Sequence, residues 1–113
     1  MMPEGLPQRP NAPAVQEDSR RLADLRNIGK AALADFAVLG IQTVQYLAEQ
    51  EPDHLYLALC QKTRQRHDPC VHDVFAAAIH QARTGEAMNW WAFTSDRKVR
   101  QQNGTFPVYD ATL

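Results

Sequence analysis

The stretch LRNIGKAALADFAVLGIQTVQYLA, from Leu25 to Ala48, decides the fold, because it holds helical patterns separated by turn residues. Within it, Ala32 and Phe36 have the i, i+4 spacing of one buried helix face. Gly40 follows at the place where many helices end in a left-handed residue. The stretch therefore predicts a helix over residues 30–39 with a sharp turn on each side.

Helical spacing of apolar residues continues through most of the chain, and no alternating strand pattern of useful length occurs. Pro52 and Pro69 suit the first turns of helices, Asp68 suits an N-cap and Gly85 suits a C-terminal turn. The expected helices cover residues 17–26, 30–39, 43–50, a segment from 52, residues 68–84 and a short segment from 94. These helices predict an all-α fold, a compact bundle of five or six short helices.

The chain of 113 residues has room for one domain with one modest core. Residues 1–15 are rich in proline and predict a flexible arm. Residues 16–100 form the expected helical domain. Residues 101–113 predict a loosely ordered tail, which Phe106 and Tyr109 could attach to the body.

The composition, with 44% hydrophobic and 22% charged residues, is that of an ordinary globular protein. No apolar run approaches the roughly 18 residues needed to span a bilayer, and the first residues lack the apolar core of a secretory signal. We therefore expect a cytoplasmic protein without a membrane partner. The net charge of −1 argues against strong, non-specific polyanion binding, although residues 62–66 and 97–100 carry local basic clusters.

Asn27, Ile28, Gly29, Lys30 and Ala31 form the corner before the helix of residues 30–39. A sharp corner needs a positive φ, which we expect at Gly29, since glycine tolerates it best and asparagine is the next best choice. The first N–H groups of the helix lack intrahelical acceptors and face outward with the positive end of the helix dipole. The corner is thus a candidate phosphate site to which Lys30 adds a charge; the alternative is a purely structural turn.

The same residues resemble the helix-hairpin-helix motif, whose hairpin is Gly-hydrophobic-Gly, with Asn27 in place of the first glycine. The longer string LxNIG…LxxLGIxTVxxLA…P…LY, followed by RHDPCVxDVF and WW, resembles the bacterial pathogenicity locus family. Those are small helix-hairpin-helix proteins, some of them labelled mitomycin resistance proteins. The resemblance, over about residues 25–98, implies a helix-hairpin-helix (SAM-like) core whose hairpin amides contact a DNA backbone phosphate without reading bases.

Cys60, His67, Cys70 and His72 lie within 13 residues, and three interpretations of them remain open. Both cysteines can be small buried apolar residues. Alternatively, Cys70 lies in a first helical turn, where the dipole lowers a thiol pKa, and His67 could assist a reactive thiolate. Four soft ligands could also hold zinc, but the C-x6-H-x2-C-x-H spacing matches no standard zinc site. We expect no bound metal or other cofactor.

Trp90 and Trp91 are adjacent, so one of them can close the core while the other stays near the surface. An exposed tryptophan beside Arg97 and Lys98 could stack on a base or on a protein partner.

The sequence resembles no catalytic triad, carboxylate pair, Walker loop or dinucleotide fingerprint, so we do not expect an enzyme. The expected function is weak binding of duplex or branched DNA without sequence preference, in DNA repair or a stress response. One alternative is a protein-docking adaptor with the same fold, which would have a protein partner instead of DNA. Another is a thiol or metal protein centred on Cys60, His67 and Cys70.

Overall fold

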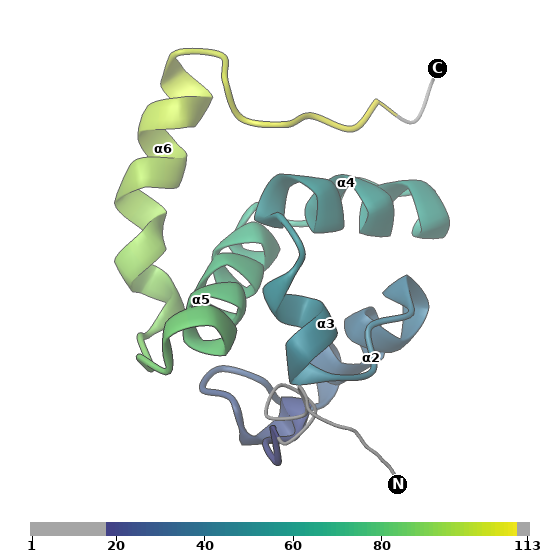
Figure 1. The fold of residues 1–113 in the computed structure, drawn as a ribbon. Coiled ribbons are helices and arrows are strands. Elements are labelled where there is room, and N and C mark those ends of the chain that lie inside the picture. Colours follow the sequence, from purple (N-terminus) through teal and green to yellow (C-terminus); the bar gives the residue numbers. More distant parts are fainter. Residues whose placement is uncertain (1–17, 111–113) are drawn as a thin grey trace, which may run out of the picture.

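The computed structural model describes residues 18–110, so the arm predicted at residues 1–15 lies outside the described part. Residues 18–110 form five α-helices and two short 3-10 helices, with no strand among them (Figure 1). In chain order these are η1 (Leu22–Asp24), α2 (Lys30–Leu39), α3 (Val44–Ala48), α4 (Pro52–Thr63), α5 (Cys70–Thr84), η2 (Trp90–Phe93) and α6 (Thr94–Gln102). The predicted all-α class is confirmed.

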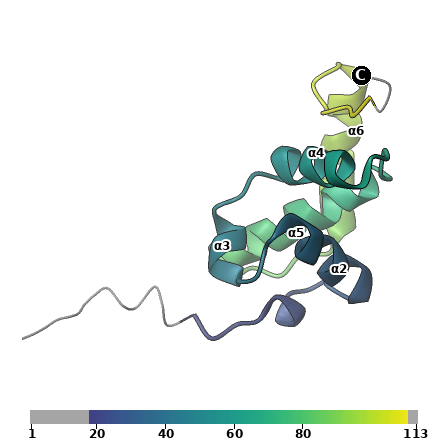
Figure 2. The same ribbon diagram turned by 90° about the vertical axis from the view of Figure 1, so that its right-hand side faces the viewer.

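Helix α5 is the centre of the bundle (Figures 1 and 2). Helices α3 and α4 pack directly on it, and α2 packs on α4. Helix α6 and η2 cover the other side of α5, and the chain after α6 turns back and runs over α4 (Figure 1). No helix in residues 18–110 has both the length and the apolar character required to cross a membrane.

The core is built from aromatic and aliphatic side chains that these helices turn inward. Phe36 of α2 stacks on Phe75 of α5 with ring centroids 5.7 Å apart, which joins the first half of the bundle to its central helix. Both rings are almost completely buried, and burial of this apolar area is the main stabilising contribution. The other fully buried large side chains include Val44, Leu47, Tyr56, Leu59, Cys60 and Ile79.

Most of the expected helix ends are confirmed. Helix α2 spans the predicted residues 30–39, and Gly40 follows it in the left-handed conformation with φ 75°. Thr43 caps α3, because its hydroxyl oxygen accepts a hydrogen bond from the Tyr46 amide at 2.9 Å. Helix α5 starts one residue later than predicted, with Pro69 rather than Asp68 as its N-cap, although the Asp68 carboxylate accepts from the Cys70 amide at 2.8 Å.

The helix predicted over residues 17–26 is wrong, since the described part of it contains only η1. Here acidic side chains bind backbone amides, and Arg21 adopts an extended backbone as the N-cap of η1, so no helix runs through it. The Asp18 carboxylate accepts from the Arg20 amide at 3.0 Å, and the Asp24 carboxylate accepts from the Arg21 amide at 2.8 Å. The apolar residues of the segment, Leu22 and Leu25, are nevertheless buried as expected.

Phe106 anchors the segment after α6, which was predicted as a loosely ordered tail. Its ring is buried against Tyr56 and against His72, at centroid distances of 5.6 Å and 4.9 Å. Further along, the Tyr109 carbonyl accepts a hydrogen bond from Arg66 Nε at 3.1 Å. Phe106 therefore belongs to the core of the domain.

Candidate functional site

The corner before α2 is held by the side chain of Asn27. Its amide nitrogen donates to the Met88 carbonyl at 2.9 Å, and its amide oxygen accepts from the Trp90 amide at 3.4 Å. These bonds tie the corner to the linker between α5 and η2. Ile28 is buried beneath the corner, as expected.

The positive φ of the corner falls on Asn27, at 75°, so its expected assignment to Gly29 is wrong. Gly29 has an extended backbone, with φ −109° and ψ −159°, and a Cβ added there would meet nothing within 4 Å. Asparagine is one of the few residues with a side chain that tolerate the left-handed region. Its two hydrogen bonds to the linker give Asn27 a reason to occupy that position.

Gly29 is the N-cap of α2, and it brings no side chain to the helix start. Its carbonyl accepts the first helical bond, from the Leu33 amide at 3.0 Å. Among residues 18–110, no acceptor binds the N–H groups of Gly29, Lys30, Ala31 and Ala32. Lys30 and Ala31 are exposed, so the helix start presents free donors and an ammonium group to solvent.

A cavity of about 360 Å³ opens beside these amides, between α2 and α5. Gly29, Lys30 and Ala31 line one side of it, and Val71 and Val74 of α5 line the opposite side. Apart from the amides and Lys30, the walls are largely apolar, which makes the cavity unlike a simple phosphate cradle.

Asn27 and Asp35 add polar side chains to the wall, and sequence reasoning did not single out Asp35. Among the described residues, its carboxylate takes part in no hydrogen bond or ion pair. Burial raises the pKa of Asp35, and attraction to His67 opposes that rise. One sequence signal could have found it, because Asp35 is the lone charged residue between Lys30 and Glu49.

The cysteine and histidine residues between positions 60 and 72 contact different parts of the fold. Cys60 is completely buried, and its sulfur accepts from the His67 amide at 3.5 Å. The His67 ring lies 2.8 Å from the Thr63 hydroxyl, so the structure pairs His67 with α4 rather than with Cys70. Among residues 18–110, no three His, Cys, Asp or Glu side chains gather as a metal site.

The surroundings of Cys70 weigh against the interpretation that its helix start activates the thiol. Partial burial and the neighbouring Asp68 carboxylate raise the pKa of the Cys70 thiol. Arg97 Nη2, which is 3.6 Å from the sulfur, opposes this rise without reversing it. A raised pKa leaves less thiolate at neutral pH, which favours an ordinary thiol over an activated nucleophile at Cys70.

His72 belongs to a charge network between α4, α5 and α6. Its Nε2 lies 2.7 Å from Asp53 Oδ1, and Arg100 donates to both oxygens of Asp53, at 3.0 Å and 2.7 Å. The Arg100 guanidinium, with a further contribution from His72, lowers the pKa of Asp53 to about 2. This network joins three helices.

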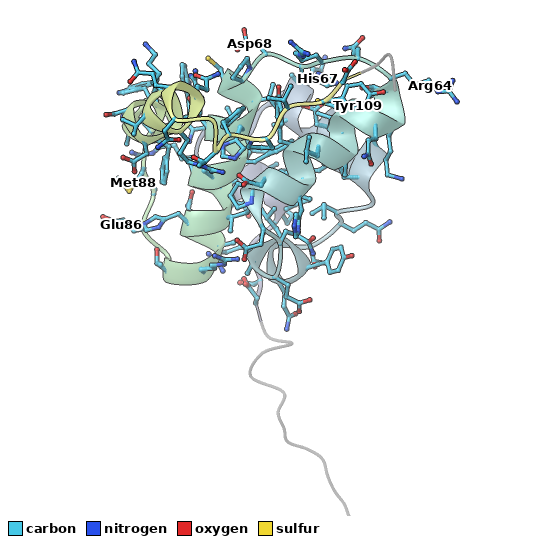
Figure 3. All side chains as sticks on the ribbon, turned by 90° about the horizontal axis from the view of Figure 1, so that it is seen from above. Arg64, His67, Asp68, Glu86, Met88 and Tyr109 are labelled. Carbon is cyan, nitrogen blue, oxygen red and sulfur yellow. The ribbon has the colours of Figure 1, made fainter. Side chains whose placement is uncertain are left out.

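The basic clusters of the sequence differ in how freely their charges face solvent. In the second cluster, Arg97 is buried against Asp73 and Arg100 is paired with Asp53. At the end of α4, Lys62 and Arg64 are exposed, and Arg64 points away from the body (Figure 3).

The two tryptophans differ in exposure, but neither is a buried residue of the core, so the expected core closure by one of them is not seen. Trp90 is half-buried beside Asn27, and Trp91 is 60% exposed. The indoles meet edge to face, with centroids 5.6 Å apart. Trp91 is therefore an exposed aromatic surface on η2.

Comparisons with known proteins match most of the chain. A family model described as "Pathogenicity locus" matches residues 15–99. The chain is 33% identical over 84 residues to a protein of Streptomyces lavendulae named "Mitomycin resistance protein McrB", which covers 74% of this chain and 80% of the relative. No solved structure gives a significant match.

Proposed function

The chain belongs to the pathogenicity locus family. We propose that it binds DNA weakly and without sequence preference, and that the start of α2 is the binding site. The observation that carries the proposal is the row of free N–H groups from Gly29 to Ala32, with the exposed ammonium of Lys30 beside them. Backbone donors at the positive end of a helix dipole suit a phosphate oxygen. Such contacts position the protein on the DNA backbone and carry no base information.

The resemblance to the helix-hairpin-helix motif supports this site. Asn27, Ile28 and Gly29 stand at the positions of its Gly-hydrophobic-Gly hairpin, and the buried Ile28 fits the role of the central residue. The segment before the corner departs from the motif, since η1 stands where a first α-helix is expected. The second helix of the motif would be α2, which carries the free donors.

The charge of the chain sets the strength of the interaction. With a net charge of −1, the protein has little long-range attraction for a polyanion. One phosphate contact on duplex DNA releases about 0.9 counterion, so binding is weak and falls as salt rises. A contribution to DNA repair or to a stress response fits such a contact, and also fits the resistance name of the Streptomyces relative.

Binding of labelled duplex and branched DNA at low salt, followed through a salt series, tests the proposal. Lys30→Glu should lower the affinity and make the slope of log affinity against log salt shallower by about one. Lys98→Glu is the matched control, because it makes the same charge change at an exposed lysine on α6. Equal losses in the two variants, or no binding by the wild-type protein, would contradict a phosphate site at α2.

Protein docking is the second candidate function, and the 60% exposure of Trp91 is the observation that favours it. Val99 on the neighbouring α6 is also exposed, at 54%. Exposed aromatic residues are enriched among the anchors of protein interfaces. Under this alternative the protein binds no DNA even at low salt, and Trp91→Ala rather than Lys30→Glu weakens binding to its partner.

A further inference from the structure

The cavity between α2 and α5 has a chemistry that a phosphate does not explain. Its volume of about 360 Å³ falls within the range of small-molecule pockets, about 300–1,000 Å³. Val71, Val74 and Phe75 give it an apolar wall on the α5 side, and Asp35 adds an unpaired carboxylate from α2. A second phosphate would be repelled by this carboxylate, so the cavity suits an apolar body that carries a hydrogen-bond donor.

The spacing along α2 relates this cavity to the free amides. Lys30 and Asp35 both line the cavity, and Asp35 lies five residues, about 7.5 Å, further along the helix axis. A nucleotide has a similar layout, because its sugar separates a charged phosphate from a flat, largely apolar base. The polar groups on the edge of the base then decide whether the Asp35 carboxylate accepts a hydrogen bond from a donor or faces another hydrogen-bond acceptor.

The phosphate contact of the proposed function reads no base. Building on it, we propose that the cavity adds a base preference on unpaired strands only, by receiving the base of a nucleotide whose phosphate lies at the start of α2. Asp35 then selects a base with an exocyclic amino group. Cytosine offers the N4 amino group and adenine the N6 amino group, whereas thymine presents the O4 acceptor at the corresponding position. A base inside a duplex is stacked and paired, so single-stranded or branched DNA is the preferred ligand.

The local electrostatics agree with this selection. Asp35 is partly buried, so its carboxylate has lost part of its hydration, and this burial raises its pKa. An amino group from the base would replace part of the lost hydration. The charged group that acts on Asp35 is His67, and Lys30 shares the lining of the cavity with it.

The test compares labelled single-stranded oligo-dC and oligo-dT of equal length at neutral pH and low salt, with duplex DNA measured in parallel. Wild-type protein should prefer oligo-dC by roughly fivefold, the lower end of what one good base contact provides. Asp35→Asn should bring this ratio close to one, because the new amide both donates and accepts. Asp35→Asn also removes a negative charge, which can raise the affinity for any DNA. The readout is therefore the ratio of the oligo-dC to the oligo-dT affinity, not either affinity alone.

Two further variants complete the test. Glu49→Gln removes a negative charge at an exposed residue elsewhere and should leave the dC to dT ratio unchanged. Val74→Phe should fill the cavity, abolishing the preference while duplex binding persists. Equal binding of oligo-dC and oligo-dT by wild-type protein that still binds duplex would overturn the base site and leave the phosphate site standing. Absence of all DNA binding would overturn both.

Discussion

Arg97 of α6 donates to both oxygens of Asp73 on α5, with its shortest contact, from Nη2, at 2.9 Å, and both side chains are buried. Thr94 adds a third donor through its hydroxyl, 2.8 Å from Asp73 Oδ2. The carboxylate is fully buried, yet three groups of the protein itself satisfy it. This ion pair holds α6 against the central helix.

Arg97→Met should strongly destabilise the domain, because it leaves the Asp73 carboxylate buried without its countercharge. Loss of one partner of a buried pair typically costs about 3–5 kcal/mol. Urea unfolding monitored by circular dichroism measures the change. The double variant Asp73→Leu with Arg97→Met should recover much of the loss, and a single variant as stable as wild type would show that the pair contributes little.

The lowered pKa of Asp53 predicts that the folded protein loses stability in acid. Arg100 and His72 lower its pKa in the folded protein to about 2, against 3.8 for a free aspartate. Its stabilising contribution is therefore complete above about pH 4 and disappears as the pH falls toward 2. The difference in unfolding free energy between wild type and Asp53→Asn should shrink over this interval. A constant difference between pH 5 and pH 2 would contradict this role.

Cys70 should react slowly with iodoacetamide at neutral pH, because its raised pKa leaves little thiolate. Asp68→Asn removes a negative charge beside the thiol and should speed labelling at pH 7.5, shifting the rate profile toward lower pH. Asparagine also caps helices well, so the change in stability should be small. Cys60 is completely buried and should label only on unfolding. Mass spectrometry of the labelled peptides separates the two sites.

Local signals predicted the helix ends well, because caps and terminal glycines act over a few residues. Thr43 binds the Tyr46 amide within its own turn, and Gly40 adopts its left-handed φ directly after α2. The helix predicted over residues 17–26 was wrong for a related reason. Asp18 and Asp24 accept hydrogen bonds from the backbone amides of Arg20 and Arg21, and these local bonds favour a short turn over a longer helix. Bonds between near neighbours therefore decided the helix ends at Gly40 and Thr43 and also the structure of residues 17–26, where the sequence interpretation was wrong.

Long-range relationships escaped prediction because no local pattern encodes them. Asp73 pairs with a residue 24 positions away, and within a helical pattern it reads as an ordinary surface acid. The burial of Phe106 depends on the chain reversing after α6. For the candidate site, the sequence identified the corner residues but not the cavity beside them, whose opposite wall comes from α5.

Asn27 should be the sensitive residue of the corner. Asn27→Gly keeps a residue suited to φ 75° but loses the bonds to Met88 and Trp90, each worth about 0.5–1.5 kcal/mol. Asn27→Ala loses the same bonds and adds a left-handed backbone cost of about 1–2 kcal/mol. In urea unfolding, the wild-type protein should therefore be the most stable, Asn27→Gly less stable and Asn27→Ala the least stable. If the Asn27→Ala protein were as stable as the Asn27→Gly protein, the left-handed backbone at this position would carry no cost for a residue with a side chain.

Gly29→Ser should separate a phosphate site from a structural corner, because it changes stability and DNA affinity in opposite directions. Gly29 is an N-cap with negative φ and open space at its Cβ position, so serine fits without strain. The new hydroxyl can accept from the free amides of Ala31 or Ala32 and stabilise α2, by up to about 1 kcal/mol. The same bond occupies a donor that the DNA phosphate needs, so affinity should fall.

Gly29→Ala is the matched control for this experiment, because it adds the Cβ without the hydroxyl and leaves the amides free. It should bind DNA as wild type does, with slightly lower stability, since alanine is a poor N-cap. Thermal unfolding and DNA titration at low salt, carried out on the same three proteins, measure both effects. A serine variant that is more stable and still binds DNA at wild-type strength would show that the amides of α2 are not the phosphate site.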